Sequence, residues 1–197
     1  MFAEPLATCV HALRLVPDTL VEVAVVLGAG TIGVLAAQVL RAAGTRVIVV
    51  SELDDARRQS AANIADAVVA PEDVCDLVSE LTGGSGAGLS IDAVGTDDTR
   101  RDSIRVLEPG GIALWLGMHE QSAAIPAFDL VVKEQRVQGS FAYTSPEFGR
   151  AIGLLESGLV VPEVSQRSFP LDEGGVVFSR LLAGTSQGFL KAIVCPA

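Results

Sequence analysis

The chain has 197 residues, of which 49% are hydrophobic, and its formal net charge at pH 7 is −10. This length fits one large domain, or one domain with an appendage, and the apolar content is sufficient for a sizeable core. The negative charge argues against a nucleic-acid partner, because proteins that bind nucleic acids normally present a basic face.

Cysteine and histidine usage gives no sign of a disulfide framework or a metal cluster. Cys9, Cys75 and Cys195 are widely spaced and form no CxxC pair, which is typical of reduced thiols in a cytoplasmic protein. His11 and His119 are the only histidines, so the sequence offers no self-evident metal site. We therefore assign no metal ligand in this chain.

Segment 20–40 is apolar enough to imitate a membrane span. However, it contains three glycines within six residues, followed by the polar residues Gln38 and Arg41. This pattern favours a buried strand and a packed helix. The first residues also lack the basic and apolar segments of a signal peptide. We therefore expect a cytoplasmic protein with no membrane partner.

The first expected helix covers residues 5–15, and the first expected strand, Val23–Leu27, runs into a glycine motif. Gly28, Gly30 and Gly33 form the pattern GxGxxG, and a helical pattern follows over residues 31–43. In this arrangement the three glycines allow a tight turn, a close approach of backbone to phosphate, and close packing of the helix on the strand. The free N–H groups of the helix N-terminus then face an anion. The motif predicts a pyrophosphate cradle.

The second expected strand, 46–50, is followed by Ser51 and Glu52. Glu52 lies 19 residues after Gly33, where dinucleotide-binding folds place the acid that holds the adenosine ribose hydroxyls. A carboxylate there repels a 2′-phosphate and so favours NAD over NADP. Two alternatives to this assignment stay open. Arg57 or Arg58 could reach a 2′-phosphate, which would favour NADP, and Glu52 could be a solvated loop acid.

The rest of the chain continues to alternate strands and helices. Further strands are expected at 66–69, 89–94, 112–116 and 136–141, and further helices at 54–63, from Pro71 to the glycines of 83–86, at 98–106, and from Pro146 to Gly158. We expect Glu108-Pro109-Gly110-Gly111 to end the 98–106 helix. The sequence therefore predicts an α/β fold, a Rossmann doubly wound six-stranded parallel sheet, with short N- and C-terminal appendages. The C-terminal appendage, 169–194, reads as turn, helix and strand.

Several motifs, taken in order, resemble the cofactor-binding, C-terminal part of medium-chain zinc-type alcohol and polyol dehydrogenases of the sorbitol and threonine dehydrogenase kind. The resemblance covers essentially the whole chain. Its motifs are the helix Glu4–Ala12, the glycine turn Gly28–Gly33, Ser51-Glu52, Asp92–Gly95, Leu107–Gly111, Leu116-Gly117, Ser168–Leu171 and Leu190–Val194.

The resemblance implies three parts: a linker helix from the catalytic domain (1–21), an NAD-binding Rossmann domain (22–164) and a C-terminal return segment of the catalytic domain (165–197). The family's N-terminal GroES-like domain, with its Cys and His-Glu zinc ligands, has no counterpart here. We therefore expect zinc only in a full-length form, with this chain either a fragment or a degenerate form. In addition, Phe141-Ala142-Tyr143 stands where sorbitol dehydrogenases have Phe-Arg-Tyr near the nicotinamide.

The resemblance also implies site residues. Those assigned to the cofactor are Gly28, Gly30, Thr31, Ile32, Gly33, Glu52, Arg57, Val94, Gly95, Leu116, Met118 and Lys191. Glu4 matches the acid beside the catalytic zinc. Each has a structural alternative: Ile32, Val94 and Leu116 would be core residues in any such sheet, Lys191 a solvated strand end, and Glu4 a helix cap.

The implied reaction is the transfer of a hydride from a secondary alcohol, such as a polyol, sugar or amino alcohol, to NAD, with zinc polarising the alcohol oxygen. We expect this chain alone to bind NAD without turnover. One alternative is a non-catalytic NAD-sensing or interaction module. A second is a nucleotide-type methyltransferase, but that fold commonly has an acid two residues before the first turn glycine, where this chain has Val26.

Beyond a small-molecule alcohol, we expect the partner to be a second copy of the chain. The apolar residues of 169–194 and the edge strand near 135–141, which family dimers pair, favour a homo-oligomer, a dimer or tetramer. The tail from about Phe169 is expected to be disordered, folded back on the sheet or packed against a neighbouring chain.

Overall fold

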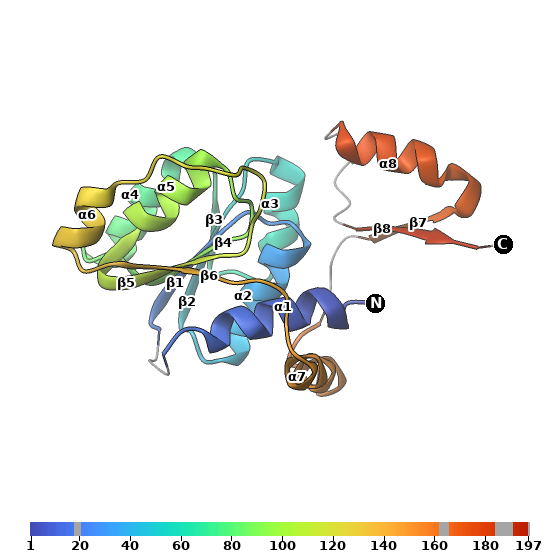
Figure 1. Cartoon of the computed structure of the whole chain (residues 1–197), viewed down its shortest axis with the longest axis horizontal. Helices are drawn as coiled ribbons and strands as arrows, with labels where there is room; N and C mark the ends of the chain where they lie inside the picture. Colours follow the sequence, from blue (N-terminus) through green and yellow to red (C-terminus); the bar gives the residue numbers. More distant parts are fainter. Residues whose placement is uncertain (18–20, 162–165, 184–190, 197) are drawn as a thin grey trace.

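The computed structural model describes residues 1–17, 21–161, 166–183 and 191–196, and Figure 1 shows their arrangement. The first part contains α1 (Ala3–Arg14), β1 (Val23–Leu27), α2 (Thr31–Ala42), β2 (Val47–Ser51), α3 (Asp55–Ala61) and β3 (Ala67–Val69). Next come the 3-10 turn η1 (Pro71–Asp73), α4 (Val74–Leu81), β4 (Ala87–Asp92), α5 (Asp97–Arg105) and β5 (Leu107–Trp115). The remainder contains α6 (Ala127–Val132), β6 (Arg136–Gly139), α7 (Ser145–Glu156), β7 (Gln166–Pro170), the 3-10 turn η2 (Leu171–Glu173), α8 (Gly174–Leu182) and β8 (Lys191–Cys195).

Six parallel strands form one sheet in the order β3-β2-β1-β4-β5-β6. This is the order of a doubly wound Rossmann sheet, so the expected fold class is confirmed. The chain crosses from β3 at one edge to β4 beside β1, which makes β1–β4 the switch point of the topology. In such sheets the crevice at the carboxyl ends of the strands, next to the switch point, is where ligands bind.

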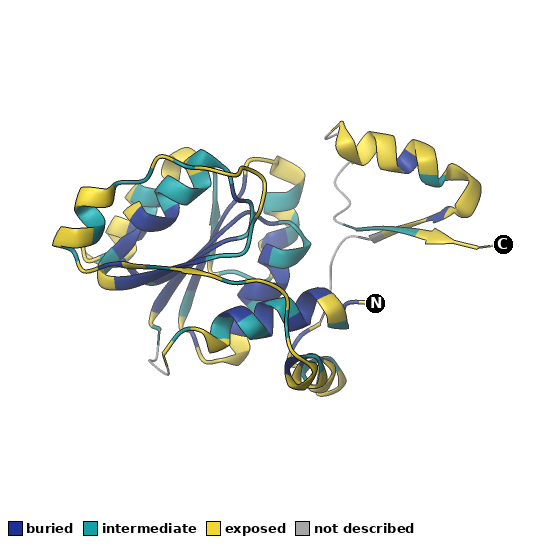
Figure 2. Cartoon of the chain, viewed as in Figure 1, coloured by how far each residue is buried: buried dark blue, intermediate teal, exposed yellow. Residues whose placement is uncertain are grey.

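Strand β1 is buried on both faces, as Figure 2 shows for the centre of the sheet. Its side chains alternate between two cores because successive Cβ atoms point to opposite faces. Ala24 and Val26 join a core with residues of α1 and α2, whereas Val25 and Leu27 join a core that contains Val78 of α4. The all-apolar sequence of β1 is therefore explained by helices on both faces.

The segment Glu108–Gly111, which was expected to end a helix, instead belongs to a strand. Residues 108–111 lie inside β5, and the pairing of β4 with β5 shifts from Ala87↔Leu107 to Leu89↔Ile112. The extra residues form an irregularity in which Pro109 and Gly110 are exposed. A proline and a glycine with positive φ are compatible with a strand at such a bulge, where no ladder bond is needed.

Two elements were not expected from the sequence, the short helix α6 and the strand β7. Helix α6 has six residues and only one polar side chain, that of Asp129, so it is too short and too uniformly apolar to show an amphipathic pattern. Strand β7 is about half polar and ends in a proline, and among the described strands its parallel partner is β8, which lies beyond α8 in the chain. A local pattern cannot show that pairing.

The C-terminal appendage is thus strand, 3-10 turn, helix and strand, rather than turn, helix and strand. Figure 1 shows this unit set apart from the six-stranded sheet. Phe169, Val177 and Ala192 form its small core. Leu171, Val176, Phe178 and Leu182 are more than half exposed, and α8 is mostly exposed in Figure 2. The expected apolar residues Phe189 and Leu190 lie outside the described residues.

None of the described helices is long and apolar enough to cross a membrane. This finding agrees with the reading of segment 20–40 as a strand and a packed helix.

A buried carboxylate joins the N-terminal helix α1 to α7. Glu147 accepts hydrogen bonds from the backbone N–H of Thr144 (2.6 Å) and from its hydroxyl (2.8 Å). It also faces Nδ1 of His11 at 3.1 Å and Nη1 of Arg14 at 2.9 Å. These contacts, led by the Thr144 N–H and followed by His11, lower the pKa of Glu147 from 4.5 to about 2. His11 thus has a structural partner in Glu147.

We predict that Glu147 makes the fold sensitive to acid. Because its folded pKa lies below its ordinary value, the ionised form stabilises the fold above pH 4.5, and this stabilisation is lost as pH falls toward 2. Between pH 5 and 2, unfolding of the Glu147→Gln variant in urea should take up about one proton fewer than unfolding of the wild type. An unchanged pH slope would contradict this role. Glu156→Gln, at the other end of α7, is the matched control.

Candidate dinucleotide-binding site

Most of the sequence-predicted site residues gather at the carboxyl edge of the sheet. The glycine turn follows β1, Glu52 follows β2, Val94 and Gly95 follow β4, and Leu116 and Met118 follow β5. Parallel strands end at the same edge, so four separate segments of the sequence meet beside the switch point.

The glycine turn fits the cradle predicted from the motif. Gly28 has φ +96° and donates its N–H to the Ser51 carbonyl at 2.7 Å. A Cβ on Gly28 would overlap the Val94 side chain, and one on Gly33 would overlap the Gly28 carbonyl oxygen. By contrast, a Cβ on Gly30 would meet nothing within 4 Å. The space in front of Gly30, at the N-cap of α2, is therefore open for a phosphate.

Glu52 is a buried acid fixed against the glycine turn. It is 8% exposed, and its carboxylate accepts hydrogen bonds from the backbone N–H of Ala29 (2.7 Å) and of Asp54 (3.0 Å). The alternative of a solvated loop acid is therefore wrong. A carboxylate has about four acceptor positions, so acceptor capacity remains for ribose hydroxyls. That ribose role stays a prediction.

The two neighbouring arginines differ in availability. Arg58 donates to the carbonyls of Glu52 (2.5 Å) and Leu53 (2.8 Å) and pairs with Asp55. Arg57 binds through its backbone, donating its N–H to the N-cap Asp54 at 2.9 Å. Within the described part of the chain, no hydrogen bond or ion pair holds its guanidinium. Arg57 is thus the arginine to consider for a 2′-phosphate.

The loops after β4 and β5 touch each other. A Cβ on Gly95, which has φ +89°, would lie 2.5 Å from the Gly117 carbonyl carbon and 2.7 Å from the Met118 nitrogen. The N–H of Leu116 donates to the Asp92 carbonyl at 3.0 Å. These contacts bring the predicted residues of both loops to one wall of the crevice. The Met118 side chain is 75% exposed, so its backbone is the part held in place.

The remaining predicted residues lie outside this wall. Ile32 is partly buried against the core around α1 and α2. Glu4 is exposed in the first turn of α1. The Lys191 ammonium of β8 lies 5.0 Å from the centre of the Phe2 ring, a cation–π contact with the N-terminal segment. The roles of Glu4 at zinc and of Lys191 at the pyrophosphate stay predictions.

Asp92, although part of the motif Asp92–Gly95, and Arg100 were assigned no role from the sequence. Asp92 is fully buried and pairs with Arg100 of α5 at 3.0 Å. An acid at the end of the apolar strand β4 was a visible signal, because a buried charge needs partners. Nothing local in the sequence identified Arg100 as that partner.

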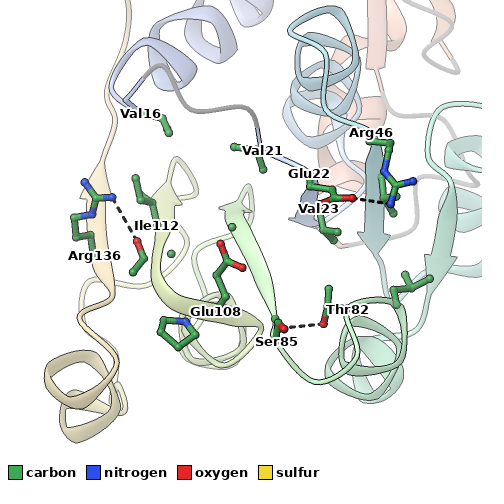
Figure 3. Close-up of a pocket in the computed structure, with 17 residues that line it drawn as sticks. Val16, Val21, Glu22, Val23, Arg46, Thr82, Ser85, Glu108, Ile112 and Arg136 are labelled. Carbon is green, nitrogen blue, oxygen red and sulfur yellow. Dashed lines mark hydrogen bonds and ion pairs between the residues drawn. The ribbon is translucent and has the colours of Figure 1, made fainter.

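A cavity of about 740 Å³ lies at the opposite, amino edge of the sheet (Figure 3). It is lined by strand starts such as Val23 and by paired charges, since Glu22 bonds Arg46 at 2.7 Å. Arg136 contacts the Gly110 carbonyl at 3.4 Å. Doubly wound sheets bind ligands at the carboxyl edge, so size does not make this cavity the dinucleotide site.

The described residues do not fit a catalytic zinc. Among them, no group of three or more His, Cys, Asp or Glu side chains is placed to hold a metal. Burial, with a smaller contribution from Glu4, raises the pKa of the Cys9 thiol to about 12. Because zinc binds the thiolate, Cys9 is poorly suited as a ligand.

Comparison with known proteins gives a consistent picture. A family model described as zinc-binding dehydrogenase matches residues 31–157. The Aspergillus terreus protein named "Probable D-xylulose reductase A" is 33% identical over 189 residues, which cover 92% of this chain and 54% of that protein. The chain spans about half the length of the curated relatives it matches.

Solved structures share the fold. The 2R,3R-butanediol dehydrogenase of Bacillus subtilis is 27% identical, with a TM-score of 0.85 over 99% of this chain and 56% of that one. A structure from Sinorhizobium meliloti described as a zinc-binding dehydrogenase bound to NADP is 30% identical, with a TM-score of 0.79 over 90% of this chain and 54% of that one.

Two glycine substitutions should separate the binding role of the turn from its packing role. Gly30→Ala should change the free energy of unfolding by less than about 1 kcal/mol, since a weaker N-cap is offset by lower entropy of the unfolded chain. It should still weaken NADH binding, because the methyl group enters the open space. Gly33→Ala should cost about 3 kcal/mol, because the methyl forces α2 away from the β1 turn. Denaturation measures the free energy of unfolding of both variants, and calorimetry measures their NADH affinity. An unchanged NADH affinity in Gly30→Ala would contradict the proposed phosphate cradle.

Proposed function

The chain belongs to the zinc-binding dehydrogenase family, and on that premise we propose that it is the NAD-binding part of an oxidoreductase. The proposed reaction transfers a hydride between a secondary alcohol and NAD. The single observation that supports this proposal most strongly is the open face of Gly30 beside the buried Glu52. An anion cradle next to a fixed acid suits a pyrophosphate joined to a ribose.

In this proposal each wall of the crevice has one task. The N-terminus of α2 binds the pyrophosphate through its backbone N–H groups. Glu52 accepts hydrogen bonds from the adenosine ribose, and its orientation is set by Ala29 and Asp54. Val94, Gly95, Leu116 and Met118 orient the nicotinamide end. The bound nicotinamide supplies the hydride-accepting chemistry, and the protein supplies position and exclusion of water.

The substrate class is proposed from the relatives. Two of them carry the names of D-xylulose and 2R,3R-butanediol, which are compounds with several oxygen-bearing carbons. This supports a polyol or sugar, among the expected polyol, sugar and amino alcohol classes, as the substrate of the whole protein. Because the described residues do not fit a zinc site, we place alcohol activation outside them. We expect these 197 residues to bind NAD without turnover.

The domain division proposed from the sequence fits this assignment. Residues 22–164 contain the Rossmann sheet, whereas β7 and β8 form a separate two-stranded sheet. We propose that 1–21 and 165–197 belong with the catalytic part of the family fold. A non-catalytic NAD-sensing module is the second candidate, favoured by the same glycine turn. Turnover of a polyol by the natural full-length product would exclude it.

The choice of NAD over NADP depends on Glu52. A buried carboxylate beside the ribose would repel a 2′-phosphate, whereas Arg57 would attract it. The Sinorhizobium meliloti structure was solved with NADP, so similarity of fold alone does not select NAD. Glu52 is held in place by two backbone N–H groups, while Arg57 is held only by its backbone, and for this reason we propose NAD.

We predict that calorimetry will give a dissociation constant for NADH at least about tenfold lower than for NADPH, a difference of about 1.4 kcal/mol. Glu52→Gln should reduce this ratio to about threefold or less by weakening NADH more than NADPH, because the neutral amide no longer repels phosphate. Glu22→Gln, an exposed acid at the opposite edge, should leave the ratio unchanged. An unchanged ratio in Glu52→Gln would show that Glu52 does not select the cofactor.

We also propose that the chain self-associates through the β6 edge of the sheet. Phe128, Val131 and Val132 of α6, the helix that precedes this edge strand in the chain, are 78%, 78% and 63% exposed. Exposed apolar side chains next to an unpaired strand edge favour association.

Light scattering should therefore show a dimer or larger assembly at micromolar concentration. Phe128→Asp should raise its dissociation constant at least about tenfold, because association would bury a charge. Leu53→Asp, which changes an equally exposed leucine at the other side of the sheet, is the control. A monomeric wild type would contradict the proposal.

A further inference from the structure

The loops after β4 and β5 are in direct backbone contact, and they form the wall assigned to the nicotinamide end. Gly95 and Gly117 meet where neither has room for a Cβ atom. The N–H groups of Leu116 and Gly117 both donate to the Asp92 carbonyl, at 3.0 and 2.9 Å, and the N–H of Glu120 donates to the Gly95 carbonyl at 2.9 Å. A shift of one loop must therefore move the other.

Asp92 fixes the first of these loops through its side chain. Its carboxylate is fully buried, and Oδ1 accepts hydrogen bonds from the N–H groups of Val94 and Gly95, each at 2.9 Å. The other oxygen, Oδ2, faces Nη1 of Arg100 at 3.0 Å. A buried carboxylate requires such a partner, because removing one member of a buried ion pair leaves an uncompensated charge.

Arg100 reaches the second loop as well. It lies on α5, and its side chain is 11% exposed. Its Nη2 donates to the carbonyl of Gly117, and the guanidinium lies 4.3 Å from the centre of the Trp115 ring. One planar group thus contacts the carboxylate of Asp92, a carbonyl of the β5 loop and an aromatic face. A lysine ammonium, a point charge without a plane, cannot make all three contacts together.

The Trp115 ring is itself held in place. Its Nε1 donates a hydrogen bond to the Ser103 hydroxyl at 3.0 Å. Ser103 is fully buried and lies on α5, the helix that also carries Arg100. The Ser90 hydroxyl of β4 donates to the Ser103 carbonyl at 2.5 Å. Helix α5 is therefore tied to both strands, and Arg100 extends from a fixed base.

We propose that Arg100 is a positioning residue for the nicotinamide half of the crevice, acting by locking the β4 and β5 loops together through Asp92 and Gly117. The proposal rests on the proposed cofactor binding. Arg100 does not itself contact the cofactor, since its guanidinium is turned toward Asp92, Gly117 and Trp115. Its effect reaches the cofactor through the backbone of Val94, Gly95 and Met118.

The adenosine half of the crevice is built without Arg100. Glu52 is oriented by Ala29 and Asp54, and the glycine turn is held by Ser51 and by the packing of Gly33 on Gly28. Loss of Arg100 should therefore weaken contacts with the nicotinamide and leave contacts with the adenosine and pyrophosphate intact. A purely structural role would weaken both halves equally, or neither.

The experiment compares NADH with ADP-ribose, which lacks the nicotinamide ring. Dissociation constants are measured by calorimetry below the unfolding transition for the wild type, Arg100→Leu, Arg100→Lys and the control Arg105→Leu, an exposed arginine on the last turn of α5. For Arg100→Leu the dissociation constant of NADH should rise about tenfold, and that of ADP-ribose should change less than twofold. Arg100→Lys should give an intermediate rise for NADH, and Arg105→Leu none.

The outcomes separate this proposal from the proposed function. A wild type that binds neither ligand overturns the proposed function. A wild type that binds both ligands, with equal changes or no change for NADH and ADP-ribose in the Arg100 variants, overturns only the role of Arg100. If Arg100→Leu does not fold, Arg100→Lys decides, because it keeps a positive charge beside Asp92: an NADH affinity equal to that of the wild type would contradict the proposal.

Discussion

The crevice depends on one close contact, the packing of α2 on the turn that ends β1. Because Gly33 has no side chain, the first turn of the helix lies against the Gly28 carbonyl. This contact aims the helix N-terminus across the edge of the sheet and leaves the face of Gly30 open. It also places Ala29 where its N–H meets the carboxylate of Glu52 at 2.7 Å. A helix set farther from the strand would separate the anion cradle from the acid beside it.

Buried carboxylates organise the loops around this contact. Glu52, Asp92 and Glu147 are each less than a tenth exposed, and each accepts a hydrogen bond from backbone N–H groups at the end of a strand or the start of a helix. Burying a charge is costly unless it is paired or hydrogen-bonded. The cost is offset only when the loop keeps one conformation, so these acids hold irregular segments in fixed positions.

The two ends of the chain differ in how much of their apolar surface is buried. Helix α1 is packed firmly, since Leu6 and Cys9 are fully buried against the core and Glu147 joins its last turns to α7. Among its described residues, the β7–α8–β8 unit has a small core of its own and exposes most of its apolar side chains. A hydrophobic face of this kind is usually covered by another surface. The contrast supports assigning the C-terminal unit to a larger assembly than the sheet alone.

The sequence by itself determined the sheet and the glycine turn. Val23–Leu27 and the helix after it were placed almost to the residue, because β-branched runs, glycine spacing and helix patterns are local properties. It also singled out Glu52, by its distance from Gly33, as the candidate acid for the ribose. Only the tertiary structure decided that Glu52 is buried, that Glu108–Gly111 lie in a bulged strand, and that Arg100 joins Asp92 to Gly117. These facts depend on contacts between segments that are distant in the sequence, and such contacts produce no local residue pattern from which they could be predicted.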